Sequence, residues 1–423
     1  MHKYQGPTKR PGGLARAHSS GAPGVGSRRV SIGGRKLPWA ALVAAVVAVG
    51  GAGPATSAYA LGAPSSPASG RTLVADAPGL TGFSPMSVTY VSTSEGWALG
   101  LVACGTSRCL RLLHTTNRDA SWSLLPVPPV GPQGPDGPQL KVRFADSDDG
   151  WIFPTEPGEG PAMAWSTHSG GEHWTAIHFP GTTSPSGPPG VEDIEAAAGV
   201  VNAAVQVGDQ VEVFSSPVSS NDWKRTGGPF ELGAGPVPSG QLALQGNSGW
   251  FVENDRVVVS GGREKPSGKW AGWTPPCSRS GGPDLLAAAT ADRLVAICTE
   301  GVWTGKKVTI DLVTSTNGGA SFGPSHLLPF TSTDQADVTA ATGTSTVAIG
   351  ATVNHANTVD DALEMSFNGG TSWHSVYSHV GAGWLELGFT TVDQGVAIAL
   401  ANSGPNIMLA TSDGGRHWAP VSF

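Results

Sequence analysis

The sequence predicts an all-β fold: a single seven-bladed β-propeller of four-stranded blades, preceded by a signal peptide or signal anchor. Three observations predict this fold. A polar turn motif recurs about every 50 residues, a period typical of solenoids, arrays and propellers. Short β-rich runs lie ahead of each turn, and a second motif recurs with the same period. After residue 60, no segment keeps a helical period over three turns.

The turn motif is clearest at Thr411–Trp418, TSDGGRHW, close to the C-terminus. Related segments lie at Ser366–Trp373, Ser315–Phe322 and Thr167–Trp174, with a decayed version at Thr115–Trp122. The steps between successive closing aromatic residues are 52, 49, 47, 52, 51 and 45 residues, measured at Trp122, Trp174, Trp223, Trp270, Phe322, Trp373 and Trp418. Seven units follow from these markers. Weak markers in the third and fourth units leave six or eight blades open.

In the first unit, four β-rich runs at residues 87–91, 96–100, 109–115 and 121–125 are bounded by turn-forming residues. The second motif, Val88-x-Tyr90-x5-Gly96-Trp97, joins the first two of these runs and recurs from Val142. A twisted four-stranded unit cannot bury both faces alone, so it packs against copies of itself, and radial packing closes into a propeller. We therefore expect a basic N-terminus with a signal at 1–60, a flexible linker at 61–79 and the propeller at 80–423.

Charge is unevenly distributed along the chain. Residues 1–60 carry eight Lys and Arg and no acidic residue, so residues 61–423 hold 17 Lys and Arg against 32 Asp and Glu, a net charge of −15. Affinity for nucleic acid depends on basic side chains that neutralise phosphates. An acidic body therefore argues against a nucleic-acid partner.

The N-terminal region has the pattern of an export signal. Basic residues end at Lys36, the 16-residue apolar stretch LPWAALVAAVVAVGGA follows, and a small-x-small site stands at residues 58–60. We expect either a cleaved signal, with the mature chain starting at Leu61, or a retained anchor that is the only contact with a membrane. Either way, the protein is expected to be secreted or membrane-anchored with the propeller outside the cytoplasm.

The four cysteines all follow the signal, and an even number suits an oxidising compartment. The short loop between Cys104 and Cys109 favours a local disulfide, which leaves Cys277 to pair with Cys298. Each bridge is expected to join neighbouring strands of one blade. Metal-ligand spacings are absent from the sequence, and the loosely grouped histidines lack helical ligand spacing. We expect no metal site and no cofactor.

The Ser/Thr-x-Asp/Asn-Gly-Gly-x-x-Trp turns resemble the Asp-box, or bacterial neuraminidase repeat, and the chain is similar to secreted actinobacterial-type propellers related to the photosystem II assembly factor family. The resemblance covers about residues 80–423. It implies a structural hairpin between the third and fourth strands, away from the substrate face. Sialidases, xyloglucanase-like glycosidases, sorting receptors and assembly factors share this box, so it does not specify function. The residues assigned to the box are Asn117, Asp119, Trp122, Gly170, Gly171, Trp174, Asn317, Gly318, Gly319, Phe322, Asn368, Gly369, Gly370, Trp373, Asp413, Gly414, Gly415 and Trp418.

A sialidase site is not expected, because the chain has no Arg-Ile-Pro element and only Tyr90 and Tyr377 follow the signal. No catalytic residue is predicted. A glycosidase needs only two carboxylates close in space, and the loops between blades gather at one mouth of a propeller. The candidates for that mouth are Glu192, Asp193, Glu195, Asp337 and Glu386, with Asp284 and Asp334 on the same loops and Glu156, Glu159, Asp360 and Asp361 on loops after the second strand.

Two Pro- and Gly-rich segments, at residues 126–138 and 180–190, suggest stiff loops between blades. Stiff loops on a rigid scaffold favour binding, because they lose little entropy on contact. We therefore expect an exported, non-catalytic binding or assembly module, acting as a monomer, that recognises a protein or glycan of the cell envelope. The alternative is a glycoside hydrolase, sialidase-like or xyloglucanase-like, that uses the mouth carboxylates. A purely structural envelope protein is a third possibility.

Overall fold

The computed structural model describes residues 80–130, 139–155, 162–182, 189–231, 239–254, 259–265, 267–277, 284–300, 308–355 and 358–423. The chain divides into two units, residues 1–70 and 71–423, and the described residues all belong to the second. The predictions for the signal and the linker lie outside the described residues. Within the described part, all elements are strands, and no helix is long and apolar enough to span a membrane.

Five sheets have four antiparallel strands each, joined in chain order. The first two contain β1 (Ser84–Tyr90), β2 (Gly96–Cys104), β3 (Ser107–Thr115) and β4 (Ser123–Leu125), then β5 (Leu140–Phe144), β6 (Asp149–Pro154), β7 (Met163–His168) and β8 (Thr175–His178). The next two contain β9 (Gly190–Ala197), β10 (Val200–Val207), β11 (Gln210–Pro217) and β12 (Lys224–Glu231), then β13 (Ser239–Gln245), β14 (Ser248–Asn254), β15 (Val259–Glu264) and β16 (Trp270–Gly272). The last contains β24 (Gly381–Phe389), β25 (Gly395–Ala401), β26 (Ile407–Thr411) and β27 (Ala419–Pro420).

A sixth sheet has seven strands, in the order β17 (Asp284–Ala288), β18 (Leu294–Glu300), β19 (Val308–Ser315), β20 (His326–Thr342), β21 (Thr346–His355), β22 (Thr358–Ser366) and β23 (His374–His379). The prediction of seven four-stranded blades is therefore wrong: the structure has five, and the sequence of two predicted units forms this single sheet.

The strand β20 causes the difference. Its first part pairs with β19 and its second part with β21, and Thr331 and Ser332 pair on both sides. From the first sheet to the seven-stranded one, Pro- and Gly-rich segments separate the last strand of one sheet from the first strand of the next, as at residues 126–138. The corresponding stretch, LLPFTSTDQADVTA, has one proline and no glycine. Residues with high β propensity therefore continue as one strand where a break was expected.

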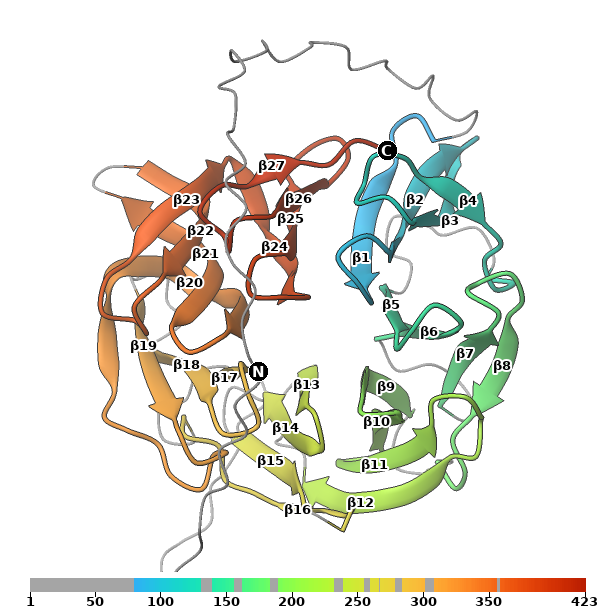
Figure 1. The fold of residues 1–423 in the computed structure, drawn as a ribbon, viewed down its shortest axis with the longest axis horizontal. Helices are drawn as coiled ribbons and strands as arrows, with labels where there is room; N and C mark the ends of the chain where they lie inside the picture. Colours follow the sequence, from blue (N-terminus) through green and yellow to red (C-terminus); the bar gives the residue numbers. More distant parts are fainter. Residues whose placement is uncertain are drawn as a thin grey trace, which may run out of the picture. The chain divides into compact units, whose positions relative to one another are not determined.

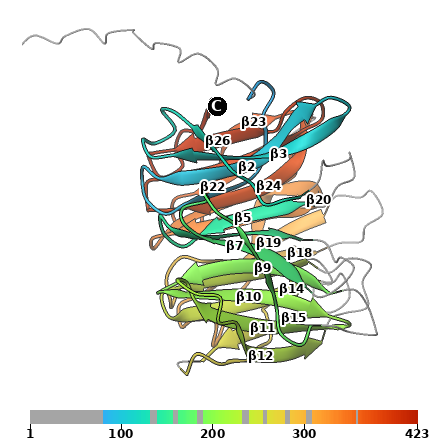
Figure 2. The same cartoon turned by 90° about the vertical axis from the view of Figure 1, so that its right-hand side faces the viewer.

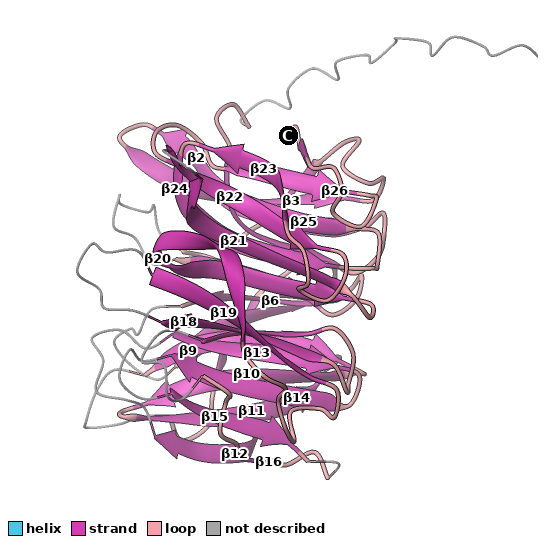
Figure 3. Cartoon of the chain, turned by 90° about the vertical axis from the view of Figure 1, so that its left-hand side faces the viewer, coloured by secondary structure: helices cyan, strands magenta, loops and turns pink. Residues whose placement is uncertain are grey.

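The sheets surround a centre (Figure 1). The first strand of each sheet lies innermost, and β1, β5, β9, β13, β17, β20 and β24 contact one another in that order, with β24 contacting β1 again. Figures 2 and 3, from opposite sides, show neighbouring sheets packed face to face. Each interface between sheets holds an apolar cluster. Trp97 of β2, for example, stacks between His114 of its own sheet and Phe144 of the next, with ring centroids 4.6 and 3.8 Å away.

The second motif has a packing explanation. Tyr90 pairs with Gly96 across the first hairpin, and a Cβ atom on Gly96 would stand 2.6 Å from the tyrosine ring. Phe144 covers Gly150 in the same way. Glycine at the start of the second strand therefore makes room for the aromatic ring that ends the first strand.

The turn motif forms the same hydrogen bonds in all five copies within the described residues. In the last copy, the Thr411 hydroxyl accepts the Gly415 N–H at 3.0 Å, and the Asp413 carboxylate accepts the His417 N–H at 3.0 Å. Both glycines of this copy have positive φ, 74° and 88°. The short polar side chains thus satisfy the backbone inside the turn, and glycine supplies the left-handed conformation. Trp418 follows the turn and is buried, as expected.

The second glycine of each glycine pair also packs on the preceding repeat, and for Gly370 the residue met is Leu312 of β19, in the same seven-stranded sheet. A Cβ atom on Gly171 would meet Leu112 and Leu125 of the first sheet at 3.2 and 3.1 Å. A Cβ atom on Gly319 would similarly meet Leu294 at 2.9 Å, and Trp273 of the preceding sheet at 3.1 Å. In addition, Trp97 donates its indole N–H to the Gly170 carbonyl of the next sheet at 3.1 Å. The turns therefore hold sheets together as well as closing hairpins.

Both predicted disulfides are present. Cys104–Cys109 joins the ends of β2 and β3, as expected. Cys277–Cys298 joins β18 to the segment that follows β16, so the expectation that it links two strands of one sheet is wrong. Cys277 packs with Trp250 of the neighbouring sheet. This bridge therefore ties the connection between two sheets to the second of them.

The glycine pair at residues 369 and 370 gives a matched test of this packing. Gly369→Ala adds a Cβ atom that meets nothing within 4 Å, whereas in Gly370→Ala the Cβ atom collides with the buried Leu312. Both positions have positive φ, 74° and 95°, so both variants carry backbone strain of about 1–2 kcal/mol. We expect Gly370→Ala to lower the free energy of unfolding by about 1–3 kcal/mol more than Gly369→Ala does, in urea titrations. Equal losses would mean that the close contact with Leu312 is unimportant.

Candidate functional site

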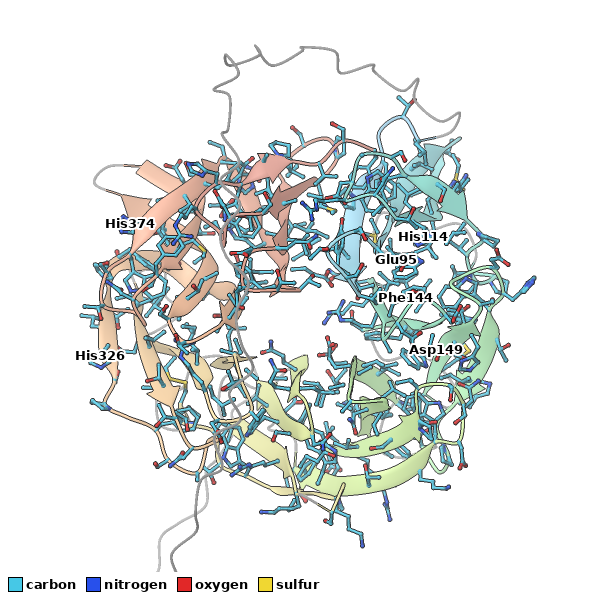
Figure 4. All side chains as sticks on the ribbon, in the orientation of Figure 1. Glu95, His114, Phe144, Asp149, His326 and His374 are labelled. Atoms are coloured by element: carbon cyan, nitrogen blue, oxygen red, sulfur yellow. A yellow bond between two sulfur atoms is a disulfide. The ribbon has the colours of Figure 1, made fainter. Side chains whose placement is uncertain are left out.

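A cavity of about 450 Å³ lies among the inner strands, at the centre of the ring. Side chains from these strands project toward the centre (Figure 4). Its lining combines charged residues with apolar ones such as Leu242 and Leu285. The charged residues of the lining are Lys141, Arg143, Asp193, Glu195, Asp337 and Glu386.

Irregularities in four inner strands help to place this lining. The pairing of an inner strand with its neighbour shifts at Met86 of β1, Glu192 of β9, Asp337 of β20 and Leu385 of β24. A β-bulge changes the direction of the following side chains and increases the local twist. Each of these four bulges lies next to, or forms part of, the lining of the cavity.

Polar side chains on the inner strands bond to the backbone of the next sheet. Asp193 accepts the N–H of Leu242 at 3.0 Å, and Gln241 accepts the N–H of Leu286 at 3.1 Å. Glu386 accepts the N–H of Val88 at 2.7 Å. These bonds satisfy buried donors that have no partner in their own sheet, and the last joins the C-terminal sheet to the N-terminal sheet.

Arg143 is the centre of the charged group. Its Nε donates to Glu195 at 2.6 Å and its Nη1 to Glu386 at 2.9 Å, so one guanidinium pairs with two carboxylates. The same Nη1 lies 3.3 Å from the Ser87 hydroxyl, which itself donates to Glu386 at 2.8 Å. Lys141 is less engaged, because its ammonium lies 3.8 Å from Asp193, beyond hydrogen-bond distance.

Burial shifts the pKa values of this group. Burial raises the pKa of Glu195 to about 7; Asp193 adds to the shift, and Arg143 opposes it. Burial likewise raises the pKa of Glu192 to about 7, against the Gly240 N–H and Lys141. Burial alone would lower the pKa of Arg143, but the carboxylates around it, Glu386 first, raise that pKa well above its usual value. Arg143 is therefore a permanent cation beside a glutamate that titrates near neutral pH.

Four of the five predicted mouth residues come together here, Asp193, Glu195, Asp337 and Glu386. The fifth, Glu192, is buried and accepts the Gly240 N–H at 3.1 Å, so it holds two sheets together. The prediction that these residues sit on loops is wrong, because all five lie on the inner strands β9, β20 and β24. Asp361, expected on a loop, is a buried residue of β22 that accepts a bond from Thr352. Glu156, Glu159 and the side chains of Asp284 and Asp334 lie outside the described residues, as do residues 131–138 and 183–188 of the two stiff segments.

The two cations of the lining were not among the site residues predicted from the sequence. Arg143 and Lys141 stand in the second copy of the Val-x-Phe motif, two residues apart and therefore on one face of the strand. Their spacing from Gly150 could have placed them on the innermost strand. The sequence could not show that Glu195 and Glu386, 52 and 243 residues away, meet Arg143.

Histidines pair singly with carboxylates. His114 lies 3.1 Å from Glu95 and His168 lies 2.6 Å from Asp149 (Figure 4 labels three of the four). Among the described residues, no group of three or more His, Cys, Asp and Glu is arranged to hold a metal ion.

No protein-family model matches this sequence, and no curated protein matches it. Solved structures do match. One, described as "YCF48 bound to D1 peptide", has 16% identity and a TM-score of 0.53, over 78% of this chain and 94% of that chain. Another, a "new family of Polysaccharide lyase PL25-Ulvanlyase bound to -[GlcA(1-4)Rha3S]-", has 10% identity and a TM-score of 0.51, over 80% of this chain and 95% of that chain.

The chain is a β-propeller. At these identities the likeness concerns the fold alone. The predicted all-β propeller with four-stranded blades is thereby confirmed. The propeller brings inner strands from the whole length of the chain to one cavity, which is a common place for a binding site.

The raised pKa of Glu195 predicts a pH dependence of stability. Its carboxyl holds a proton more tightly in the folded state, with a pKa of about 7, than in the unfolded state, so stability is lost as pH rises from about 4.5 to 7. Glu195→Gln should remove about 1–3 kcal/mol of the loss measured between pH 5 and 8 by urea unfolding. The exposed Glu172→Gln is the control and should keep the wild-type slope. A wild-type slope in Glu195→Gln would contradict the assignment.

Proposed function

We propose that this chain is an exported, non-catalytic binding or assembly module that acts as a monomer and recognises a protein or glycan of the cell envelope through the central cavity. The observation that carries the proposal is the cavity itself, about 450 Å³, where a rigid ring of strands fixes charged and apolar side chains. A pre-formed cavity with a few placed polar groups is typical of a binding site. Of the two ligand classes, we favour an extended protein segment.

The state of the carboxylates supports a non-catalytic role. A glycosidase needs one acid free to donate a proton and a second carboxylate free to attack or to activate water. Here Glu386 accepts bonds from Ser87, from the Val88 N–H and from Arg143. Glu386 therefore has the partners of a structural residue that joins the first and last sheets.

A peptide as ligand has support from a protein of the same fold. The structure described as "YCF48 bound to D1 peptide" is a propeller-fold match that covers most of both chains. The identity of 16% carries over no residue and no partner. What it supports is that a propeller of this size can hold a peptide.

Glu195 favours a second candidate, a polysaccharide hydrolase or lyase. Its pKa of about 7 suits a general acid or base at neutral pH, and the matched polysaccharide lyase was solved with a saccharide. For this candidate, Arg143 would orient an acidic sugar and Glu195 would transfer a proton.

We also propose that the five turns, four of which contain a glycine pair, belong to the Asp-box class and that the chain is exported. The repeated bonds of a Ser or Thr hydroxyl and an Asn or Asp side chain to the backbone support the first assignment. The two disulfides, together with the basic and apolar N-terminal pattern, support export.

N-terminal sequencing of protein from the culture medium should give Leu61 first, whereas an anchored form would stay with the membrane fraction. Accumulation of full-length protein in the cytoplasm would contradict both forms.

A random peptide library displayed on phage tests the binding proposal with the full chain as bait. Enriched peptides, made synthetically, should bind wild type and lose about tenfold or more of their affinity for Leu285→Trp, which fills the cavity. Leu327→Trp is the matched control, because Leu327 is 65% exposed on β20, and it should bind as wild type does. Equal binding to both variants would place the peptides elsewhere and contradict the proposal. Turnover of a uronic-acid or xyloglucan oligosaccharide that Glu195→Gln abolishes would replace it with the second candidate.

A further inference from the structure

The charged lining of the cavity is unbalanced. Four carboxylates, those of Asp193, Glu195, Asp337 and Glu386, face two cations, Lys141 and Arg143. Both cations already have a carboxylate within 4 Å. With all groups ionised, the lining carries a net charge of −2, so the cavity attracts a further positive charge.

Glu195 is the carboxylate best placed to receive that charge. Its Oε1 accepts from Arg143, and within the described residues its Oε2 accepts no hydrogen bond. The side chain keeps 30% of its surface exposed, against 11% for Glu386 and 4% for Asp193. The open oxygen can therefore accept a donor from outside, whereas Asp193 bonds to the N–H groups of Ile194 and Leu242.

The net charge of the chain after residue 60 also favours a positively charged ligand. Residues 61–423 carry a net charge of −15, so the field around the propeller draws basic partners and repels acidic ones. The lining also offers apolar surface at Val88, Leu242 and Leu285. The methylene groups of a lysine or arginine pack on such a surface while the charged end reaches a carboxylate.

The cavity is suited to bind a side chain of the ligand and not to pair with the ligand's backbone as an added strand. The N–H groups of two lining residues, Val88 and Leu242, and that of Leu286, next to the lining residue Leu285, already donate to side chains of the preceding sheet. Adding the ligand as a further strand at this wall would break those bonds. Recognition must therefore come from the charged and apolar side chains.

We propose that the cavity receives a basic side chain, lysine or arginine, of an extended protein segment, with the open oxygen of Glu195 as its counter-ion. This inference rests on the proposed function and names the chemistry of its ligand. Asp337 is another carboxylate of the lining. Lys141 and Arg143 attract acidic side chains, but the four carboxylates of the lining outnumber them and repel such side chains.

Three fluorescein-labelled decapeptides test the proposal with the full-length protein: five repeats of Lys-Ser, of Gln-Ser and of Glu-Ser. In anisotropy titrations, the Lys-Ser peptide should bind wild type at least about tenfold more tightly than the other two, and less tightly as salt rises. Glu195→Gln should remove about tenfold of this affinity, and Asp337→Asn is the second variant should Glu195→Gln fold poorly. Exposed Glu172→Gln should bind as wild type does.

The pH dependence separates Glu195 from general surface attraction. Between pH 6 and 8, wild type should bind the Lys-Ser peptide more tightly as Glu195 loses its proton. Glu192 titrates in the same range, and it is present in both proteins, as are the other charged groups of the lining, Lys141, Arg143, Asp193, Asp337 and Glu386. The slope lost in Glu195→Gln therefore belongs to Glu195. An equal slope in both proteins would overturn its assignment as the counter-ion.

The outcomes distinguish this inference from the proposed function. If library peptides require an open cavity but the Lys-Ser peptide binds no better than Gln-Ser, the inference fails and the proposed function stands. Tighter binding of the Glu-Ser peptide, or of an oligogalacturonate, would also overturn the inference. If no peptide of either kind binds, both fail.

Discussion

The structure depends on side chains that satisfy backbone groups across the gap between neighbouring sheets. Each sheet is built from consecutive strands, so among the strands that the structure describes none is exchanged between the first and last sheets to close the ring. Closure instead rests on Glu386, which accepts the Val88 N–H, on Asn406, which bonds to Ser84 and Pro85, and on an apolar cluster. Because a buried N–H without a partner is costly, these bonds specify how the sheets fit together.

The same bonds shape the cavity. Asp193 and Glu386 hold sheets together and also line the central space, so they have little freedom to act as catalysts. Glu195 differs, since it lies beside Arg143 but has one oxygen that accepts no hydrogen bond from the part of the chain that the structure describes. Side chains that join sheets and a side chain that does not therefore line the same cavity, and an oxygen that is not used between sheets is the one open to a ligand.

Local features of the sequence predicted local features of the structure. The glycine pair of the turn, the Tyr90–Gly96 pairing and the Cys104–Cys109 bridge all follow from residues close together in the chain. The long strand β20 was missed, because a break was assumed where the sequence has no strong breaker. Arg143 was missed for a different reason: its partners come from sheets far apart in the sequence, and pattern alone does not show which inner strands face one another.

At two places the turn sequence departs from the repeat, and the hydrogen bonding of an aromatic residue packed near the turn differs as well. At 119 the first unit has aspartate in place of the second glycine, and Tyr90 is the only tyrosine in the aromatic position of the first strand. In other sheets the tip of a phenylalanine ring approaches that glycine, as Phe144 approaches Gly171. The tyrosine hydroxyl needs an acceptor there, and it donates to Asp119.

Trp151 shows the opposite case. Its indole N–H is buried without a partner in the described residues, whereas Trp97 and Trp250 donate to a glycine carbonyl of the next sheet. The third unit lacks the glycine pair, so the carbonyl that would accept this bond is missing. A change in one turn thus removes a hydrogen bond from the neighbouring sheet, because adjacent sheets of a propeller stabilise each other.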